Sequence, residues 1–260
     1  MSSILVLGAA RAVPVALMLP AFGGRHLTRG LRLALGLLIA LLGWPQLAGA
    51  FHGAGLGRAA PALWLLVFGR EVAVGASVGF VASLAFRAAQ AAGHLGDVLR
   101  GANAAALLVP AAEADAESPL QILYRLLAVV IFLEIGGLSR VVAAMVNSYA
   151  AVPLGLGQSS VAGMQSAALI VALASAKLVV SALALAAPLV VALLLADVAL
   201  AVLARVAPDL PIYFLGLPLK SLLGVGVVLL GLGIINGALA GGFAGWLEML
   251  NRTLASFRGQ

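Results

Sequence analysis

Seven charged residues lie inside or close to long apolar stretches of the sequence. They are Arg11, Arg70, Glu71, Arg125, Glu134, Lys177 and Asp197. A charge at membrane depth costs about 2.5–3.5 kcal/mol even on lenient insertion scales, so each of these side chains needs a partner or water. Two chemistries fit such residues: a polar path for a proton, ion or substrate, or internal salt bridges that hold helices together. The weight of the pattern favours salt bridges.

Arg70 and Glu71 are neighbours in the sequence. Neighbouring residues project about 100° apart on a helix, so they cannot simply neutralise each other. We expect each of them to pair with another segment or with another subunit.

A long polar interruption lies between Gly93 and Pro119, flanked by sequence that is mostly Leu, Ala, Val and Gly. It holds four of the nine acidic residues of the protein: Asp97, Glu113, Asp115 and Glu117. This stretch is therefore the candidate working part of the chain.

Signatures of an enzyme are weak. The histidines His26, His52 and His94 fall near expected loops and at no metal-ligand spacing. The Gly-Leu-Pro-Leu-Lys-Ser run at 216–221 lacks the glycine that precedes the lysine of a phosphate loop, and no Gly-x-Ser-x-Gly elbow is present. The absence of cysteine excludes disulfides, thiolate metal sites and Cys nucleophiles. We expect a protein that is not an enzyme and that uses no cofactor and no metal.

The composition is that of an integral membrane protein. Charged residues make up 9% and apolar residues 63% of the 260 residues, and the mean hydropathy is +1.17. A soluble domain carries roughly 25% charged residues, and its interior cannot hold so much apolar surface. The net charge of +6 comes from scattered basic residues without interleaved aromatic residues, which argues against nucleic acid as a partner.

Hydropathy predicts about six apolar segments in a single domain over residues 1–260. They are roughly Ile4–Phe22, Leu31–Ala50, Ala62–Ala92, Leu120–Val146, Ala167–Val206 and Leu215–Leu250. The fifth contains Pro188, so it is either one kinked helix or a hairpin that turns near this proline. The first is interrupted by Arg11 and Pro14, and we expect it to stay as a membrane segment, not a signal peptide. The arginines after it favour a cytoplasmic first loop.

Glycine recurs at every fourth residue in two of these segments. Gly75 and Gly79 follow Glu71, and the last segment carries Gly233, Gly237, Gly241 and Gly245. Such stripes let helix backbones approach closely because no Cβ intervenes. We expect them to pack tightly against neighbours, within the chain or outside it.

One stretch, Leu194–Leu223, makes the family recognisable. It carries an Ala-Asp-x-Ala-Leu-x-x-x-x-Arg-x-Ala-Pro pattern, an aromatic turn and Leu-Pro-Leu-Lys-Ser. This resembles the T subunit of the type III secretion export apparatus (SctT, also called HrcT, YscT or SpaR), whose flagellar counterpart is FliR. The residues that match the family pattern are Asp197, Arg205, Pro208, Phe214, Pro218, Lys220 and Ser221.

Two earlier stretches agree with this family in chain order. Near the N-terminus, Arg11, Pro20 and Phe22 resemble its Arg…Pro-x-Phe pattern. The central block runs over Glu71, Gly75, Gly79, Gly93, Asp97, Arg100, Gly101 and Ser118-Pro119-Leu120. Leu99 stands where many relatives have Gln, and Pro211 where Asn is common. The Asp-x-x-Arg-Gly and Ser-Pro-Leu details favour the injectisome branch over the flagellar branch.

The resemblance implies an all-α protein built from helical hairpins. Family members join R and S subunits in a helical export-gate complex in the bacterial inner membrane, with much of the assembly raised toward the periplasm. Unfolded proteins leave the cytoplasm through this gate, and the U and V subunits are further expected partners.

The resemblance also implies a role for the polar interruption. In the flagellar relative, the corresponding loop acts as a plug beneath the gate. The plug residues expected here are Ala104, Leu107, Leu108, Val109, Pro110, Glu113, Asp115, Glu117, Ser118 and Pro119.

Three other functions stay open beside this one. The chain could be a flagellar FliR, or a small-solute secondary transporter that uses the buried charges. An intramembrane hydrolase or transferase is the third, although the sequence offers no candidate nucleophile. Uptake of solute by proteoliposomes of this chain alone would favour the transporter.

Overall fold

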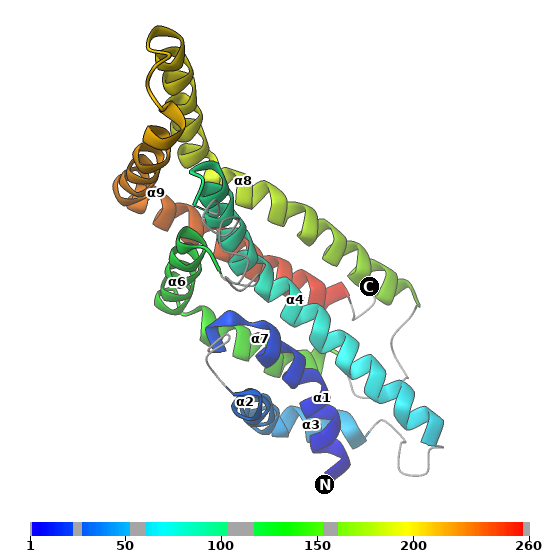
Figure 1. Ribbon diagram of the computed structural model, residues 1–260. Helices are drawn as coiled ribbons and strands as arrows, with labels where there is room; N and C mark the ends of the chain where they lie inside the picture. The colour runs from blue at the N-terminus through cyan, green and yellow to red at the C-terminus, as the bar shows by residue number, and fades with distance from the viewer. Residues whose placement is uncertain (1, 23–27, 53–60, 103–116, 153–160, 257–260) are drawn as a thin grey trace. The chain divides into compact units, whose positions relative to one another are not determined.

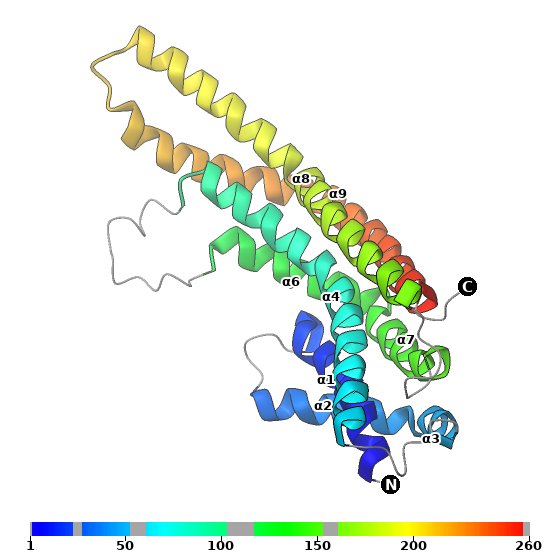
Figure 2. The ribbon, with the colours of Figure 1, turned by 90° about the vertical axis from the view of Figure 1, so that its right-hand side faces the viewer.

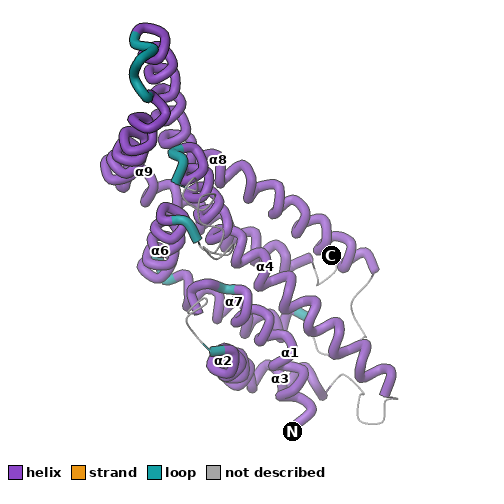
Figure 3. The backbone as a smooth tube through the Cα atoms, viewed as in Figure 1, coloured by secondary structure: helices purple, strands orange, loops and turns teal. Residues whose placement is uncertain are grey.

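The computed structural model of the protein describes residues 2–22, 28–52, 61–102, 117–152 and 161–256. Within these ranges every regular element is a helix (Figure 3). The all-α fold predicted from the sequence is confirmed.

The first two predicted segments form a group of short helices. They are α1 (Ser2–Met18), the 3-10 helix η1 (Pro20–Phe22), α2 (Arg29–Leu42) and α3 (Trp44–His52). α1 packs on both α2 and α3. Gly43 ends α2, donating its backbone N–H to the carbonyl of Ile39 at 3.1 Å. The predicted second segment, Leu31–Ala50, is therefore two helices and not one.

The third predicted segment is the helix α4 (Pro61–Leu99), and it is longer than predicted. The prediction ended the segment at Ala92, where the apolar composition stops. The helix continues for seven more residues, because the polar residues that follow bind partners inside the fold instead of interrupting the backbone hydrogen bonds. The first part of the polar interruption is thus helical.

The fourth predicted segment is divided into α6 (Pro119–Glu134) and α7 (Gly137–Ala151). Between them Gly136 takes a left-handed conformation with φ of 69°, which costs glycine little and other residues more. The adjacent Gly137 packs against the ring of Phe132, leaving no room there for a side chain.

The last two segments are the long helices α8 (Val161–Val206) and α9 (Ile212–Ser256). Figures 1 and 2 both show them folding back on each other as an antiparallel hairpin. Pro188 lies inside the continuous helix α8, so the hairpin turn suggested at this proline is wrong. The chain reverses at 207–211 instead, where Pro208 and Pro211 follow the end of α8.

The chain divides into two compact units, which we describe separately. Unit 1 comprises Met1–Ala85, Phe132–Lys177 and Phe243–Gln260, and unit 2 comprises Phe86–Ile131 and Leu178–Gly242. In unit 1 the rings of Phe132 and Phe243 lie 5.3 Å apart in the core. In unit 2 the core includes Phe86, Tyr124, Leu189 and Leu193.

Among the described residues, three helices are long and apolar enough to cross a membrane, and the bent pair of α6 and α7 would make a fourth. The protein is an all-α membrane protein, as predicted. Of the spanning windows, 67% of that in α4 is buried within the protein, against 28% in α8 and 22% in α9. The two hairpin helices therefore need lipid or another protein to cover them.

Candidate functional site

Some of the family-motif residues gather in two clusters, one in each unit. We name the cluster of unit 2 the clasp. It comprises Asp97 of α4, Arg100 and Gly101 just after α4, Ser118 just before α6, and Leu120 and Gln121 of α6. We name the cluster of unit 1 the lock: Arg11, Glu71, Ser148, Tyr149 and Val152.

In the clasp, Asp97 caps the N-terminus of a helix other than its own. The backbone N–H groups of Leu120 and Gln121 donate to its Oδ2 atom at 2.8 and 3.2 Å. First-turn amides have no partner inside their own helix, and the positive end of the helix dipole favours an anion there. Asp97 therefore binds the end of α4 to the start of α6.

Arg100 neutralises the second oxygen of the same carboxylate. Its Nε donates to Oδ1 of Asp97 at 2.7 Å, and its Nη2 lies 2.5 Å from that atom. The side chains of Asp97 and Arg100 are 0% and 6% exposed. A charge-assisted pair with both partners fixed is among the stronger side-chain interactions.

The clasp also contains the end of α4. Gly101 has φ of +77°. Its N–H donates to the carbonyl of Val98 at 3.1 Å, and the N–H of Ala102 donates to that of Asp97 at 3.0 Å. These two bonds form a Schellman motif, which needs a left-handed residue that glycine best supplies. The Asp-x-x-Arg-Gly pattern thus both ends α4 and starts α6.

Close backbone contact completes the clasp. A Cβ atom on Gly93 would lie 2.5 Å from the carbonyl oxygen of Leu120, so only glycine lets α6 approach this near. At the start of α6, the side chain of Gln121 accepts from the N–H of Ser118 at 3.4 Å, as in a capping box. Glu117, just before the helix, pairs with Arg125 at 2.9 Å.

The hairpin of α8 and α9 contacts the clasp through residues of the Leu-Pro-Leu-Lys-Ser motif in α9. Nη1 of Arg100 lies 3.4 Å from Oγ of Ser221, and a Cβ on Gly101 would lie 2.7 Å from Leu217. The neighbouring Lys220 of α9 forms an ion pair with Asp197 of α8. The structure thus joins two motifs that are about 120 residues apart in the sequence.

The predicted plug residues are mostly beyond this description. Residues 104, 107–110, 113 and 115 lie outside the described residues. Glu117, Ser118 and Pro119 are described: the first two lie just before α6, and Pro119 begins it. The clasp therefore holds the chain immediately before and after residues 103–116.

The lock of unit 1 is centred on the fully buried Arg11 of α1. Its Nε donates to Oε2 of Glu71 at 2.6 Å, and both side chains are 0% exposed. Its Nη1 and Nη2 donate to the backbone carbonyls of Ser148 and Val152 at 2.8 and 2.9 Å. These carbonyls end α7, and a cation suits the negative end of a helix dipole. One guanidinium therefore ties α1, α4 and α7 together.

The glycines after Glu71 make the lock possible. A Cβ on Gly75 would collide with the backbone of Arg11, and one on Gly79 would lie 2.9 Å from Cα of Val15. α1 therefore lies directly on the α4 backbone. Tyr149 covers the lock, with its ring 5.1 Å from the Arg11 guanidinium and its hydroxyl donating to the carbonyl of Gly8 at 2.9 Å.

The other charges that the sequence placed in or near apolar segments differ in their surroundings. Glu71 finds a partner on another segment, as expected, but Nη1 of Arg70 also lies 3.7 Å from its second oxygen. This contact is longer than the 2.6 Å hydrogen bond from Arg11 of α1, which is the main partner of Glu71. Lys177 lies over the ring of Trp246 at 5.3 Å, whereas Glu134 is exposed.

Several motif residues lie outside both clusters. Phe22 is buried in η1 beside Pro20. Arg205, Pro208, Phe214 and Pro218 are exposed around the turn between α8 and α9, with Phe214 73% exposed. These residues are therefore members of neither the lock nor the clasp.

The glycine stripe of α9 has almost no neighbours among the described residues. A Cβ on Gly233, Gly237 or Gly241 would meet nothing within 4 Å, and one on Gly245 would meet only Lys177. Close packing within the described chain is therefore not observed for three of the four. Packing against another protein stays a prediction.

Sequence reasoning missed Ser148, Tyr149 and Gln121. Ser148 and Tyr149 carry no signal, since a serine carbonyl and a tyrosine ring occur in any helix. Gln121 carried a sequence signal that could have been used, because Ser-x-x-Gln before an apolar run is typical of a capping box. Among the residues that the structure describes, no group of three His, Asp or Glu side chains could hold a metal ion.

Comparison with known proteins bears on these two clusters. The family model for bacterial export proteins, family 1, matches residues 3–245. The chain belongs to this family. The match includes every residue of the lock and the clasp.

Individual relatives of this export protein come from both flagella and secretion systems. It is 30% identical over 217 residues to the flagellar biosynthetic protein FliR of Pectobacterium carotovorum subsp. carotovorum, covering 82% of this chain and 77% of the relative. It is 33% identical over 157 residues to the Yop proteins translocation protein T of Yersinia pestis, covering 60% and 59%. It is 32% identical over 166 residues to the surface presentation of antigens protein SpaR of Shigella sonnei, covering 64% and 62%.

The chain thus spans about three-fifths of the last two relatives. Its role lies in a protein secretion or export apparatus, as a multi-pass membrane protein.

Proposed function

We propose that this chain is the T subunit of a type III secretion export gate in the bacterial inner membrane. With R and S subunits it builds the pore through which unfolded proteins are exported, and it contacts the U and V subunits. The chain itself performs no catalysis.

The observation that carries this proposal is the clasp. Motif residues from α4, α6 and α9 bind one another there through Asp97, Arg100 and Ser221. Their polar groups bind one another and form a base on either side of residues 103–116. This is what a structural gate subunit needs and what a transporter's binding residues would not do.

The length of the hairpin and its exposed apolar side chains also support binding to other proteins. A 46-residue helix such as α8 is about 70 Å long, and the apolar core of a bilayer is about 30 Å thick. The surplus must project from the membrane. Exposed apolar side chains such as Val206 and Phe214, 76% and 73% exposed, lie near the turn of the hairpin, where a partner protein would cover them.

The segment over Ala104–Pro119 is the proposed plug. The chain on either side of residues 103–116 is held by Asp97 and Ser118. Shortening this segment should leave assembly intact and let small ions leak through the closed complex. Conductance equal to that of the intact complex would refute the plug.

Co-expression with R and S subunits tests the proposal as a whole. The chain should copurify with them in a stable complex, and the Glu71→Ala variant should do so less well. A chain that stays alone and instead accumulates solute in proteoliposomes would be a transporter.

Two branches of the family fit the proposal. The Asp-x-x-Arg-Gly and Ser-Pro-Leu patterns favour the injectisome branch, whereas the alignment with a flagellar FliR covers more of the chain. Complementation of flagellar and injectisome deletion strains distinguishes them, because only the cognate apparatus should regain export.

A further inference from the structure

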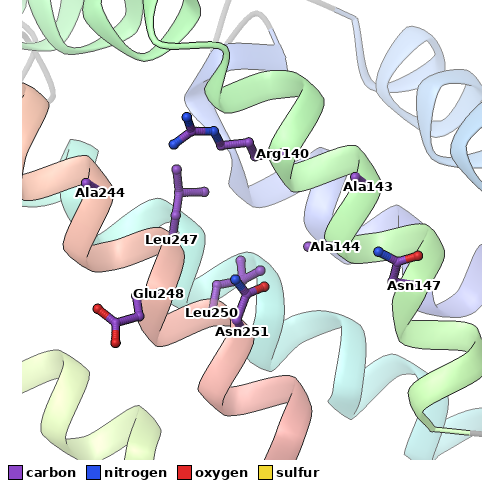
Figure 4. A pocket seen from close by; sticks show the side chains of 9 residues that line it. All are labelled: Arg140, Ala143, Ala144, Asn147, Ala244, Leu247, Glu248, Leu250 and Asn251. Carbon is purple, nitrogen blue, oxygen red and sulfur yellow. The ribbon is translucent and has the colours of Figure 1, made fainter.

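Four polar side chains that belong to neither cluster surround a groove between α7 and α9 in unit 1 (Figure 4). Arg140 and Asn147 come from α7, and Glu248 and Asn251 come from α9. The groove has a volume of about 410 Å³, which is large enough for a small polar group.

Helical spacing creates this groove. Arg140, Ala143, Ala144 and Asn147 lie on one face of α7, and Ala244, Leu247, Glu248 and Asn251 lie on one face of α9. The alanines in the middle leave space that larger side chains would fill. Ala143 and Ala244 are exposed, so the groove is open to its surroundings.

The groove carries an unpaired positive charge. Glu248 is bound to Arg252, whose Nη2 donates to Oε1 at 2.6 Å, and Figure 4 shows its carboxylate pointing away from Arg140. Arg140 makes no ion pair with any residue that the structure describes. With Lys177 beside Glu248 in an adjoining pocket, positive charges outnumber negative ones here, and the amides of Asn147 and Asn251 add hydrogen-bond donors.

The groove lies at the level of a membrane surface. No charged residue occurs in α8 between Lys177 and Asp197, a separation of about 30 Å along a helix, which equals the apolar core of a bilayer. Lys177 lies at one boundary of that window, over the ring of Trp246 in α9. Tryptophan and lysine are typical of the membrane–water interface. On this argument we place residues 244–251, which include Trp246, at the headgroup layer.

We infer that this groove binds the phosphate of an anionic phospholipid headgroup. Arg140 pairs with the phosphate, Asn147 and Asn251 donate to its oxygens or to the glycerol, and the alanine floor admits the headgroup. The inference is separate from the export function, because the chain alone suffices to test it.

Native mass spectrometry of the full-length chain, released from detergent micelles that contain phosphatidylglycerol or phosphatidylcholine, tests this inference. The chain should retain phosphatidylglycerol at least about tenfold more than phosphatidylcholine, the factor expected for one charge-assisted bond. Arg140→Gln should abolish this preference. Ala244→Leu should also abolish it, because it fills the groove without changing a charge.

Lys177→Gln is the matched control, since it removes a nearby positive charge that does not line the groove and leaves the Glu248–Arg252 pair in place. It should keep most of the preference. An equal loss in Lys177→Gln and Arg140→Gln would mean diffuse attraction and overturn the site, as would equal retention of the two lipids. Binding of inorganic phosphate as tight as that of phosphatidylglycerol would assign the groove to a free anion. A photoreactive residue at Ala143 that crosslinks to protein and not to lipid in native membranes would also overturn the inference.

Discussion

The lock and the clasp each place a buried arginine–carboxylate pair at a helix terminus. The lock lies at the C-terminus of α7, and the clasp lies at the N-terminus of α6. In the lock, a buried arginine binds the terminal carbonyls of α7 and is neutralised by Glu71. In the clasp, a buried aspartate binds the first amides of α6 and is neutralised by Arg100. Each pair places the ion that suits the helix dipole at that end.

The two clusters differ in how completely they are closed. Both partners of the lock are 0% exposed, and its arginine is covered by Tyr149. The clasp is partly open: Arg100 is 6% exposed and also reaches Ser221 on another helix. The lock is therefore closed off within unit 1, whereas the clasp also contacts α9 of unit 2 through Arg100.

The largest effect is expected from Glu71→Ala. Removing one partner of a buried ion pair leaves an uncompensated charge and costs about 3–5 kcal/mol. The thermal unfolding midpoint in detergent should fall strongly. The double variant Arg11→Met/Glu71→Met should recover much of that loss, since no charge is left unpaired. A Glu71→Ala protein as stable as the unchanged chain would contradict the lock.

Asp97→Ala should have the next largest effect. It removes charge-assisted hydrogen bonds worth about 1.5–3 kcal/mol, but Arg100 can still turn toward Ser221. Hydrogen exchange should accelerate at the amides of Leu120 and Gln121, whose acceptor is lost. Asp209→Ala, an exposed acidic residue, should leave both amides protected. Unchanged exchange in Asp97→Ala would show that these amides have another acceptor.

Glycine substitutions distinguish the packed glycines of α4 from the unpacked glycines of α9. Gly75→Ala forces a Cβ into the backbone of Arg11 and should destabilise by about 1–3 kcal/mol. Gly233→Ala meets nothing and should stabilise the isolated chain by up to about 1 kcal/mol through helix propensity. Thermal unfolding of both variants tests the difference.

A second measurement extends this comparison to the partners. If Gly233 packs against another subunit, Gly233→Leu should reduce copurification with R and S although the isolated chain stays stable. Full copurification of this variant would show that the glycine stripe of α9 is not part of the surface that binds R and S.

The smallest effect is expected from Lys220→Ala. The Asp197 side chain is 41% exposed, and exposed ion pairs contribute about 1 kcal/mol or less. A loss as large as that of Asp97→Ala, measured by the same unfolding assay, would mean that the pair lies in the apolar core of the membrane and not at its boundary.

Hydropathy predicted most helices but not their breaks. Five of the six segments began within a few residues of a helix, since apolar composition is what a membrane helix needs. The breaks at Gly43 and Gly136 were missed because neither glycine differs in sequence from the packed glycines of α4. The end of α4 was missed because Asp97 looked like a loop residue until a second helix supplied its hydrogen bonds.

The sequence by itself determined the class of protein, the family and the residues that need partners. Nine per cent charge and long apolar runs leave only a membrane protein, and the motif order identifies the export family. A charge inside an apolar helix demands a partner, so Arg11 and Glu71 could be selected without a structure, and the family motif selected Asp97.

Only the tertiary structure decided which partner each charge takes. Arg11 and Glu71 are 60 residues apart, and nothing in their spacing brings them together. They meet because Gly75 and Gly79 let α1 lie on the backbone of α4, and Asp97 meets α6 because Gly93 removes the side chain between them. The pairs are therefore determined by which helix faces meet and by the glycines that let those faces approach closely.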